Sequence, residues 1–215
     1  MLQMDVSHFH PNPRRIRFLA HDWVHDNPAL KEPVRGMGGV PASFAVAQKL
    51  IENEELVFFY PEGVRGTGKL FAMRYRLIDF DPVFVKAAIL TSSPVIPITT
   101  MGGDELYPIF RNTKFLANFL NMPYYPITWT FPWLPVFCSG IPLPIKMLIK
   151  IHKPIHLHYP PERCDDHQLR RKMARQVQYE VQSELNFLLS HRKSALAGWD
   201  IESLKELYQS RCELR

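Results

Sequence analysis

The sequence is poor in the residues that define several specialised classes of protein. It holds only three cysteines, Cys138, Cys164 and Cys212, and they are set far apart. An odd number of scattered cysteines argues against a disulfide framework and predicts a reducing environment. With 10 glycines in 215 residues, and 22% charged against 46% hydrophobic residues, the chain is neither collagen-like, a flexible linker nor a charge-rich disordered segment.

The sequence also lacks a long uninterrupted apolar run. Its first residues show no basic flank followed by an apolar stretch, so no export signal is expected. The most hydrophobic region, 115–151, contains prolines that would remove backbone hydrogen bonds from a membrane-spanning helix: Pro123, Pro126, Pro132, Pro135, Pro142 and Pro144. We therefore expect no transmembrane helix.

Large apolar side chains are nevertheless concentrated in this proline-rich region. They are Tyr124, Tyr125, Trp129, Phe131, Trp133, Leu134 and Phe137. One interpretation is a shallow surface that faces a membrane or an acyl chain. The other is a loop buried against the core, since exposed apolar patches are uncommon in soluble proteins. The sequence leaves both interpretations open.

The charge balance is mildly basic, with a formal net charge of +5 and a pI near 9.1. Such a balance suits ligands that carry phosphate, or an anionic membrane surface. No arm rich in lysine and arginine is present, so no nucleic-acid partner is expected.

Strand-like and helix-like patterns alternate along the chain. Strands are predicted at 15–20, 56–60, 94–99, 150–151 and 155–158, and helices at 44–53, at 83–90 and from about 165 onward. The remnant of a further helix is expected at 2–9. This alternation predicts an α/β fold with a mixed, mostly parallel sheet flanked by helices. We expect one domain over residues 1–197 and a short amphipathic tail over 198–215, with Gly198 as the hinge.

The sharpest local feature is a glycine-rich, basic turn at 59–69 that follows the apolar strand 56–60. Such a turn exposes backbone N–H groups beside a guanidinium, which is what binding of a phosphate monoester requires. Gly63, Gly68 and Lys69 fit the spacing of a P-loop, which gives a nucleotide-binding alternative. Leu70 stands where a P-loop needs the Ser or Thr that holds magnesium.

Three blocks in order resemble the glycerolipid acyltransferases that act on 1-acyl-glycerol-3-phosphate and related lysophospholipids. Pro61-Glu62-Gly63-Val64-Arg65 is similar to their Phe-Pro-Glu-Gly-x-Arg block. Upstream, 38–43 (Gly-Gly-Val-Pro-Ala-Ser) resembles the second block, and downstream 95–98 (Val-Ile-Pro-Ile) resembles the fourth. The resemblance covers most of the chain, from residue 14 to the long C-terminal helix.

The resemblance implies transfer of a fatty acyl group from acyl-CoA or acyl carrier protein to the free hydroxyl of a lysophospholipid. It implies no metal and no cofactor besides the acyl donor, and it places the protein on the cytoplasmic side of a membrane as a peripheral protein. The substrate phosphate would be held by Glu62, Gly63 and Arg65, with Gly39 from the second block. An arginine that the family carries after that block is replaced here by Phe44.

The family's general base is the histidine of a His-x-x-x-x-Asp motif, in which the aspartate orients the imidazole. In the family this motif precedes the strand that corresponds to 15–20, so the resemblance implies an N-terminally truncated acyltransferase domain whose catalytic pair lies before Met1. His21 and Asp26 match the motif formally but follow that strand, and they are the weak candidates within the chain. A chain without the base would be a non-catalytic lipid- or phosphate-binding protein, which is the alternative function.

A second cluster offers possible metal ligands near the C-terminal helix: His152, His156, His158, Cys164 and His167. Its spacing fits no familiar zinc motif, and prolines interrupt it, so a solvated basic edge is the preferred interpretation.

Overall fold

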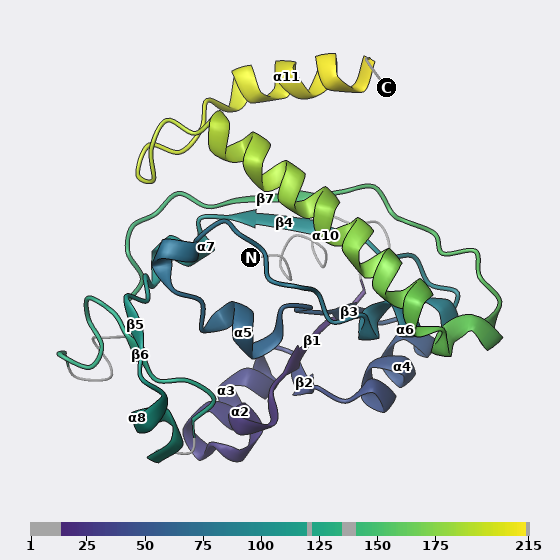
Figure 1. Ribbon diagram of the computed structural model, residues 1–215, viewed down its shortest axis with the longest axis horizontal. Coiled ribbons are helices and arrows are strands. Elements are labelled where there is room, and N and C mark those ends of the chain that lie inside the picture. The colour runs from purple at the N-terminus through teal and green to yellow at the C-terminus, as the bar shows by residue number, and fades with distance from the viewer. Residues whose placement is uncertain (1–13, 120–121, 135–140, 214–215) are drawn as a thin grey trace. The chain divides into compact units, whose positions relative to one another are not determined.

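The computed structural model describes residues 14–119, 122–134 and 141–213 of the chain (Figure 1). The helix predicted at 2–9, together with Phe137 and Cys138 in the proline-rich region, lies outside these residues. Two compact units share the chain, and each is built from several separate stretches of sequence. The first contains 1–64, 79–95 and 154–176, and the second contains 65–78, 96–153 and 177–215.

The first unit is built on a small parallel sheet. Its strands are β1 (Ile16–Ala20), β2 (Gly39–Pro41) and β3 (Leu56–Phe58), in the order β2-β1-β3. Phe18 of β1 pairs with Gly39 on one side and Phe58 on the other. The helical elements of this unit are α2 (Asp22–Asp26), α3 (Pro28–Gly36), α4 (Phe44–Glu52), α6 (Val83–Leu90), η2 (Pro161–Asp165) and the first part of α10 (His167–Ser190).

The core of the first unit is centred on α6. Phe84, Val85, Ala87, Ala88 and Ile89 are all buried there, so this helix has apolar contacts on most of its circumference. Helices α4 and α6 begin at Phe44 and Val83, where the sequence predicts them. The α/β class is therefore confirmed for this unit, with a parallel sheet of three strands.

Gly39 illustrates how tightly α3 packs on β2. A Cβ at this position would lie 2.3 Å from Val34 Cγ1 and 2.9 Å from the Val34 carbonyl oxygen. Only glycine allows so close an approach, because the Val34 backbone cannot move without displacing α3. The glycine is therefore explained by packing.

We predict that Gly39→Ala lowers the free energy of unfolding by about 1 to 2 kcal/mol, because the added methyl group overpacks this contact. Gly36→Ala is the matched control, since a Cβ there meets nothing within 4 Å. Urea denaturation of both variants checks the prediction, and equal stabilities would contradict the packing explanation.

The second unit contains two short antiparallel sheets. Strand β4 (Ile98–Met101) pairs with β7 (Leu148–Ile151), and β5 (Arg111–Asn112) pairs with β6 (Pro126–Ile127). Its helical elements are η1 (Phe71–Met73), α7 (Gly103–Leu106), α8 (Lys114–Phe119), the second part of α10 and α11 (Ile201–Glu213), and α5 (Gly63–Thr67) leads into it. The core joins Met101 of β4 to Val181, Leu185 and Leu188 of α10 and to Leu204 of α11.

The prediction of a single, mostly parallel sheet is wrong for the strands that follow β3. The run 94–99 does not join the parallel sheet, and its strand begins only at Ile98, which pairs antiparallel with Ile151. Pro94 and Pro97 have no N–H to donate, so a regular ladder cannot extend through this run. Residues 155–158 form no strand either, and only a single bridge joins Ile155 to Val95.

Within the described residues, no helix combines the length and the apolar character needed to cross a bilayer.

Candidate functional site

The carboxyl edge of the parallel sheet brings together the ends of three strands of the first unit. β1 leads directly into His21, β2 into Ser43 at the start of α4, and β3 into the turn at Tyr60. The Ala42 N–H donates to the Ala20 carbonyl at 3.0 Å and ties the ends of β1 and β2 together. In open α/β sheets, ligands bind outside the carboxyl ends of the strands.

The turn after β3 leaves open space at this edge. Gly63 has a left-handed backbone, with φ at +57°, and its N–H donates to the Tyr60 carbonyl at 2.9 Å. The Asp81 N–H donates to the Pro61 carbonyl at 2.8 Å, which anchors the turn to its own unit. Nothing lies within 4 Å of the position that a Cβ of Gly63 would take. Gly63 therefore allows the left-handed backbone that this turn needs, and the space beside it is open.

Arg65 stands on the short helix α5, two residues after Gly63. Its side chain is exposed, and among the described residues it makes no hydrogen bond or ion pair. Glu62 is half-buried at the start of the same turn. Three of the predicted phosphate-binding residues, Glu62, Gly63 and Arg65, thus lie in one turn. Gly39 does not join them, because it is buried at the opposite end of β2.

His21 and Asp26 stand at the two ends of α2. The His21 Nδ1 accepts a hydrogen bond from the Trp23 N–H at 3.2 Å, and His21 is the N-cap of the helix. Both residues are exposed, and no hydrogen bond or ion pair joins them. His21 therefore has the geometry of a helix cap, and the Asp26 carboxylate does not orient its imidazole as the family's motif requires.

The family's phosphate-binding arginine has no direct substitute at Phe44. The Lys86 Nζ lies 5.2 Å from the centre of the Phe44 ring, but it is paired with the Asp165 carboxylate at 2.7 Å. Arg35 is exposed on α3 and lies 3.5 Å from Glu32. Neither cation is therefore free of an acidic partner.

The P-loop interpretation of the same turn is wrong. In a P-loop the lysine begins a helix and reaches the phosphates, whereas here residues 63–67 form α5 and the lysine comes after it. Lys69 Nζ pairs with Asp104 Oδ2 at 3.1 Å and donates to the Arg76 carbonyl at 3.1 Å. Only 6% of the Lys69 side chain is exposed. The lysine therefore has a structural role within the second unit.

The segment that follows the glycine-rich turn is fixed by polar contacts around Tyr75. This residue has a positive φ of 64°, its N–H donates to Asp104 Oδ2 at 3.0 Å, and its carbonyl accepts from Gln182 Nε2 at 2.8 Å. Arg192 Nη1 donates to the Tyr75 hydroxyl at 2.7 Å and pairs with Glu105 at 2.7 Å. Burial and the hydrogen bond with Glu105 raise the pKa of Tyr75 to about 12. The phenol therefore stays protonated at neutral pH and serves this network.

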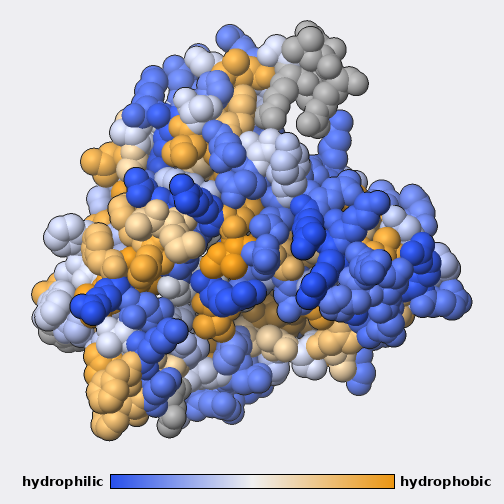
Figure 2. Space-filling view, in the orientation of Figure 1, coloured by the Kyte–Doolittle hydropathy of each residue, from blue (hydrophilic) through white to orange (hydrophobic). Residues whose placement is uncertain are grey.

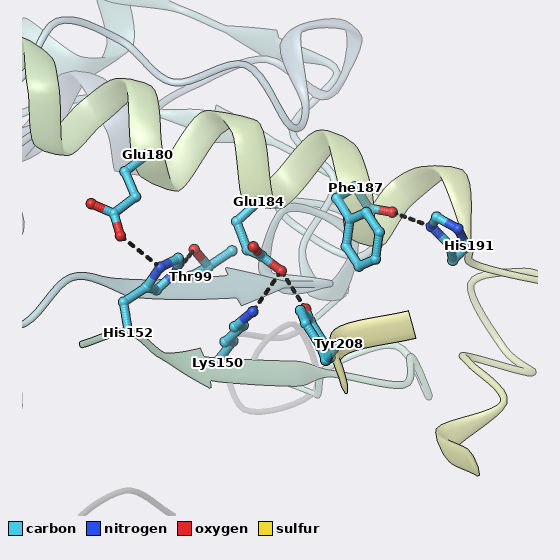
Figure 3. A network of polar contacts seen from close by, with 8 residues as sticks. All are labelled: Thr99, Lys150, His152, Glu180, Glu184, Phe187, His191 and Tyr208. Atoms are coloured by element: carbon cyan, nitrogen blue, oxygen red, sulfur yellow. Dashed lines mark hydrogen bonds and ion pairs between the residues drawn. The ribbon is translucent and has the colours of Figure 1, made fainter. Parts of the chain in front are cut away.

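A second polar network lies between β4, β7 and α10 of the second unit (Figure 3). The Thr99 hydroxyl lies 2.8 Å from His152 Nε2, and His152 Nδ1 lies 3.2 Å from Glu180 Oε1. This hydroxyl–imidazole–carboxylate series has the order of a nucleophilic triad. Thr99 is fully buried, however, so a substrate cannot reach its hydroxyl. We interpret the series as an internal brace between the strand pair and the helix.

The same network continues one helical turn along α10. Lys150 Nζ pairs with Glu184 Oε1 at 3.1 Å, and the Tyr208 hydroxyl donates to the same carboxylate oxygen. The ammonium also lies 3.4 Å from the centre of the Tyr208 ring. Glu184 therefore links β7, α10 and α11 through one buried carboxylate.

The residue spacing explains why Lys150 of β7 and His152, which directly follows that strand, meet two acids of α10. Lys150 and His152 are two residues apart on a strand, which places them about 6.7 Å apart on one face. Glu180 and Glu184 are one helical turn apart, or about 6 Å. The matched spacings were visible in the sequence, but which helix faces which strand was not. His152 is one of the possible zinc ligands in the sequence, but both of its ring nitrogens are engaged here.

The other histidines of that cluster lie outside this network. The rings of His156 and His158 are stacked, with centres 6.0 Å apart, and Cys164 is buried in η2. Over the described ranges, no three or more His, Cys, Asp and Glu side chains are grouped so as to hold a metal ion.

The chain is similar in sequence to longer mycobacterial proteins that are described as uncharacterized. No family model matches the chain. It is 37% identical over 201 residues to uncharacterized proteins of Mycobacterium bovis and Mycobacterium tuberculosis, and 36% identical over 200 residues to one of Mycobacterium leprae. These matches cover 92% of this chain but only 56% or 54% of the relatives, so the chain spans about half the length of the curated relatives that it matches.

Among solved structures, the chain is similar to the 1-acyl-sn-glycerophosphate acyltransferase PlsC from Thermotoga maritima. The TM-score is 0.49 and the sequence identity 19%, and the match covers 87% of this chain and 71% of that structure.

Proposed function

We propose that the turn at Glu62–Arg65 binds the phosphate of a lysophospholipid in an acyl-transfer reaction. The observation that carries the proposal is the exposed Arg65 guanidinium, which has no partner among the described residues and follows the open glycine turn at the end of β3. A guanidinium beside an open glycine turn matches the planar geometry and the charge of a phosphate monoester. The order of the three sequence blocks supports the lysophospholipid as the ligand.

In this proposal the acyl donor is acyl-CoA or acyl carrier protein. The glycerol hydroxyl of the lysophospholipid attacks the thioester carbonyl, an ester forms, and the CoA or carrier thiol leaves after a general base has taken the hydroxyl proton. This chain's own residues would hold the phosphate through Arg65 and set the turn through Gly63. Glu62 would position the turn or a substrate hydroxyl.

The second candidate function is binding of a phosphate-bearing lipid without acyl transfer. It is favoured by the geometry of His21, whose Nδ1 caps α2 and makes no contact with Asp26. In the described part of the chain, that histidine is the only one placed in the pattern that the chemistry requires. The two candidates share the ligand and differ only in turnover.

An assay of thiol release separates the two candidates. The chain is incubated with an acyl-CoA and 1-acyl-glycerol-3-phosphate, while binding of the lysolipid is measured in parallel by titration calorimetry. Binding with release of CoA supports acyl transfer, and binding without release supports the second candidate. Absence of binding would contradict both.

A further inference from the structure

Large aromatic side chains are exposed on the part of the second unit that contains β5, α8 and β6. We call the following residues the aromatic surface: Phe110 (47% exposed), Phe115 (78%), Phe119 (77%), Trp129 (69%) and Trp133 (69%). In Figure 2 apolar atoms gather over α8 at the lower left. Of the two interpretations of the proline-rich region, the exposed one therefore holds for Trp129 and Trp133.

The local fold directs these side chains outward. Phe115 and Phe119 are one helical turn apart and share a face of α8, whereas Ala117 between them is buried. The Thr113 N–H donates to the Tyr125 carbonyl at 3.1 Å, which fixes the start of α8 beside β6. α8 therefore packs against the second unit through Ala117 and exposes Phe115 and Phe119.

Phe110 and Trp129 form the second part of the aromatic surface, where β5 and β6 pair. Their rings meet edge to face, with centres 5.2 Å apart, and Phe110 also contacts the ring of Phe71. The hollow beside Trp129 has a volume of only about 10 Å³, which is room for no more than one water molecule. An acyl chain does not fit into this hollow.

Charge indicates what kind of partner suits the aromatic surface. No acidic residue occurs between Glu105 and Glu162, a stretch that includes the whole aromatic surface. Arg111 and Lys114 are exposed next to the aromatic residues, and within the described residues neither makes an ion pair. A stretch of sequence with exposed aromatic side chains, neighbouring cations and no acid is suited to the interface of a bilayer that contains anionic lipids.

We propose that the aromatic surface docks the protein on an anionic bilayer, with Phe115 and Phe119 inserted at the level of the headgroups and Arg111 and Lys114 facing lipid phosphates. The inference adds a partner to the proposed function and does not depend on Arg65. It is tested with vesicles that contain no lysolipid, whereas the phosphate site is tested with a short-chain lysolipid and no vesicles. A negative result in the vesicle test therefore leaves the lysolipid test informative, and the reverse also holds.

The test is co-sedimentation of the chain with phosphatidylcholine vesicles that contain 0% or 30% phosphatidylserine. We expect binding to the anionic vesicles, and at least a tenfold weaker partition for Phe115→Ser/Phe119→Ser, because burial of one phenyl ring is worth about a factor of ten. Arg111→Gln/Lys114→Gln should lower binding to the anionic vesicles by roughly fivefold for each charge.

Tyr179→Ser is the matched control, since Tyr179 on α10 is 77% exposed and lies outside the aromatic surface. Circular dichroism shows that each variant is folded, which is expected because every substituted side chain is exposed. No binding by the parent chain would overturn the proposal, and so would equal binding by the phenylalanine variant. If the chain self-associates through Phe115 and Phe119 and does not bind vesicles, a second copy covers this surface. That result would also overturn the proposal.

Discussion

Arg65→Ala should weaken binding of 1-hexanoyl-glycerol-3-phosphate about ten- to hundredfold. A charge-assisted hydrogen bond contributes on the order of 1.5 to 3 kcal/mol, and the Arg65 guanidinium makes no contact among the described residues that would compete for it. Titration calorimetry at low ionic strength measures the change directly, and the short acyl chain keeps the ligand monomeric. Because the side chain is exposed, its removal should leave the unfolding transition in place.

Arg15→Ala is the matched control for the loss of charge. Arg15 is also exposed, and it directly precedes β1 at the amino end of the same parallel sheet. Its removal changes the net charge by the same amount at the edge of the sheet where ligands are not expected. Equal losses of affinity in the two variants would show that Arg65 acts only through the net charge.

Glu184→Ala should lower the free energy of unfolding by about 3 kcal/mol, because removal of one member of a buried ion pair leaves the other uncompensated. Only 7% of the Glu184 side chain is exposed, and it accepts from both Lys150 and Tyr208. Without it, β7 and α11 lose their shared partner on α10. Urea denaturation followed by tryptophan fluorescence measures the effect.

Two further variants separate the ion pair from helix propensity and from packing. Glu180→Ala changes the same residue type one turn earlier on α10, where the carboxylate is 40% exposed, and should cost less than about 1 kcal/mol. Lys150→Met/Glu184→Leu should recover most of the lost stability, because apolar groups of similar size can replace a buried pair. If Glu184→Ala is no more destabilising than Glu180→Ala, the contacts of Glu184 with Lys150 and Tyr208 do not stabilise the fold as proposed.

The sequence predicts the elements whose pattern depends only on local spacing. Val177, Val181, Leu185 and Leu188 recur at intervals of four and three, and all are buried along α10. The continuous run at Leu56 becomes β3, although the strand ends at Phe58 and not at Tyr60 as predicted. These features need no knowledge of which elements meet in space.

The pairing of distant elements is what the sequence does not show. The run 94–99 has the composition of a central parallel strand, yet its partner is β7 and the pairing is antiparallel. Lys69 has the spacing of a phosphate-binding lysine, yet its partner is Asp104 on α7. In both cases a contact across more than thirty residues decides the role, and such contacts leave no local pattern.

Part of the candidate site was nevertheless visible in the sequence. Glu62, Gly63 and Arg65 are contiguous, so one turn brings them together whatever the rest of the fold does. Gly39 resembled a ligand-binding glycine, but the contact with Val34 that requires it depends on how α3 packs.

The central claim is that Arg65 recognises the phosphate, and it is tested by changing the ligand and the side chain together. Affinities for 1-hexanoyl-glycerol-3-phosphate and for 1-hexanoyl-glycerol are measured with the parent chain and with Arg65→Ala. We predict that the parent chain prefers the phosphorylated ligand at least tenfold and that Arg65→Ala loses this preference. The same preference in both proteins would contradict the assignment of Arg65 to the phosphate.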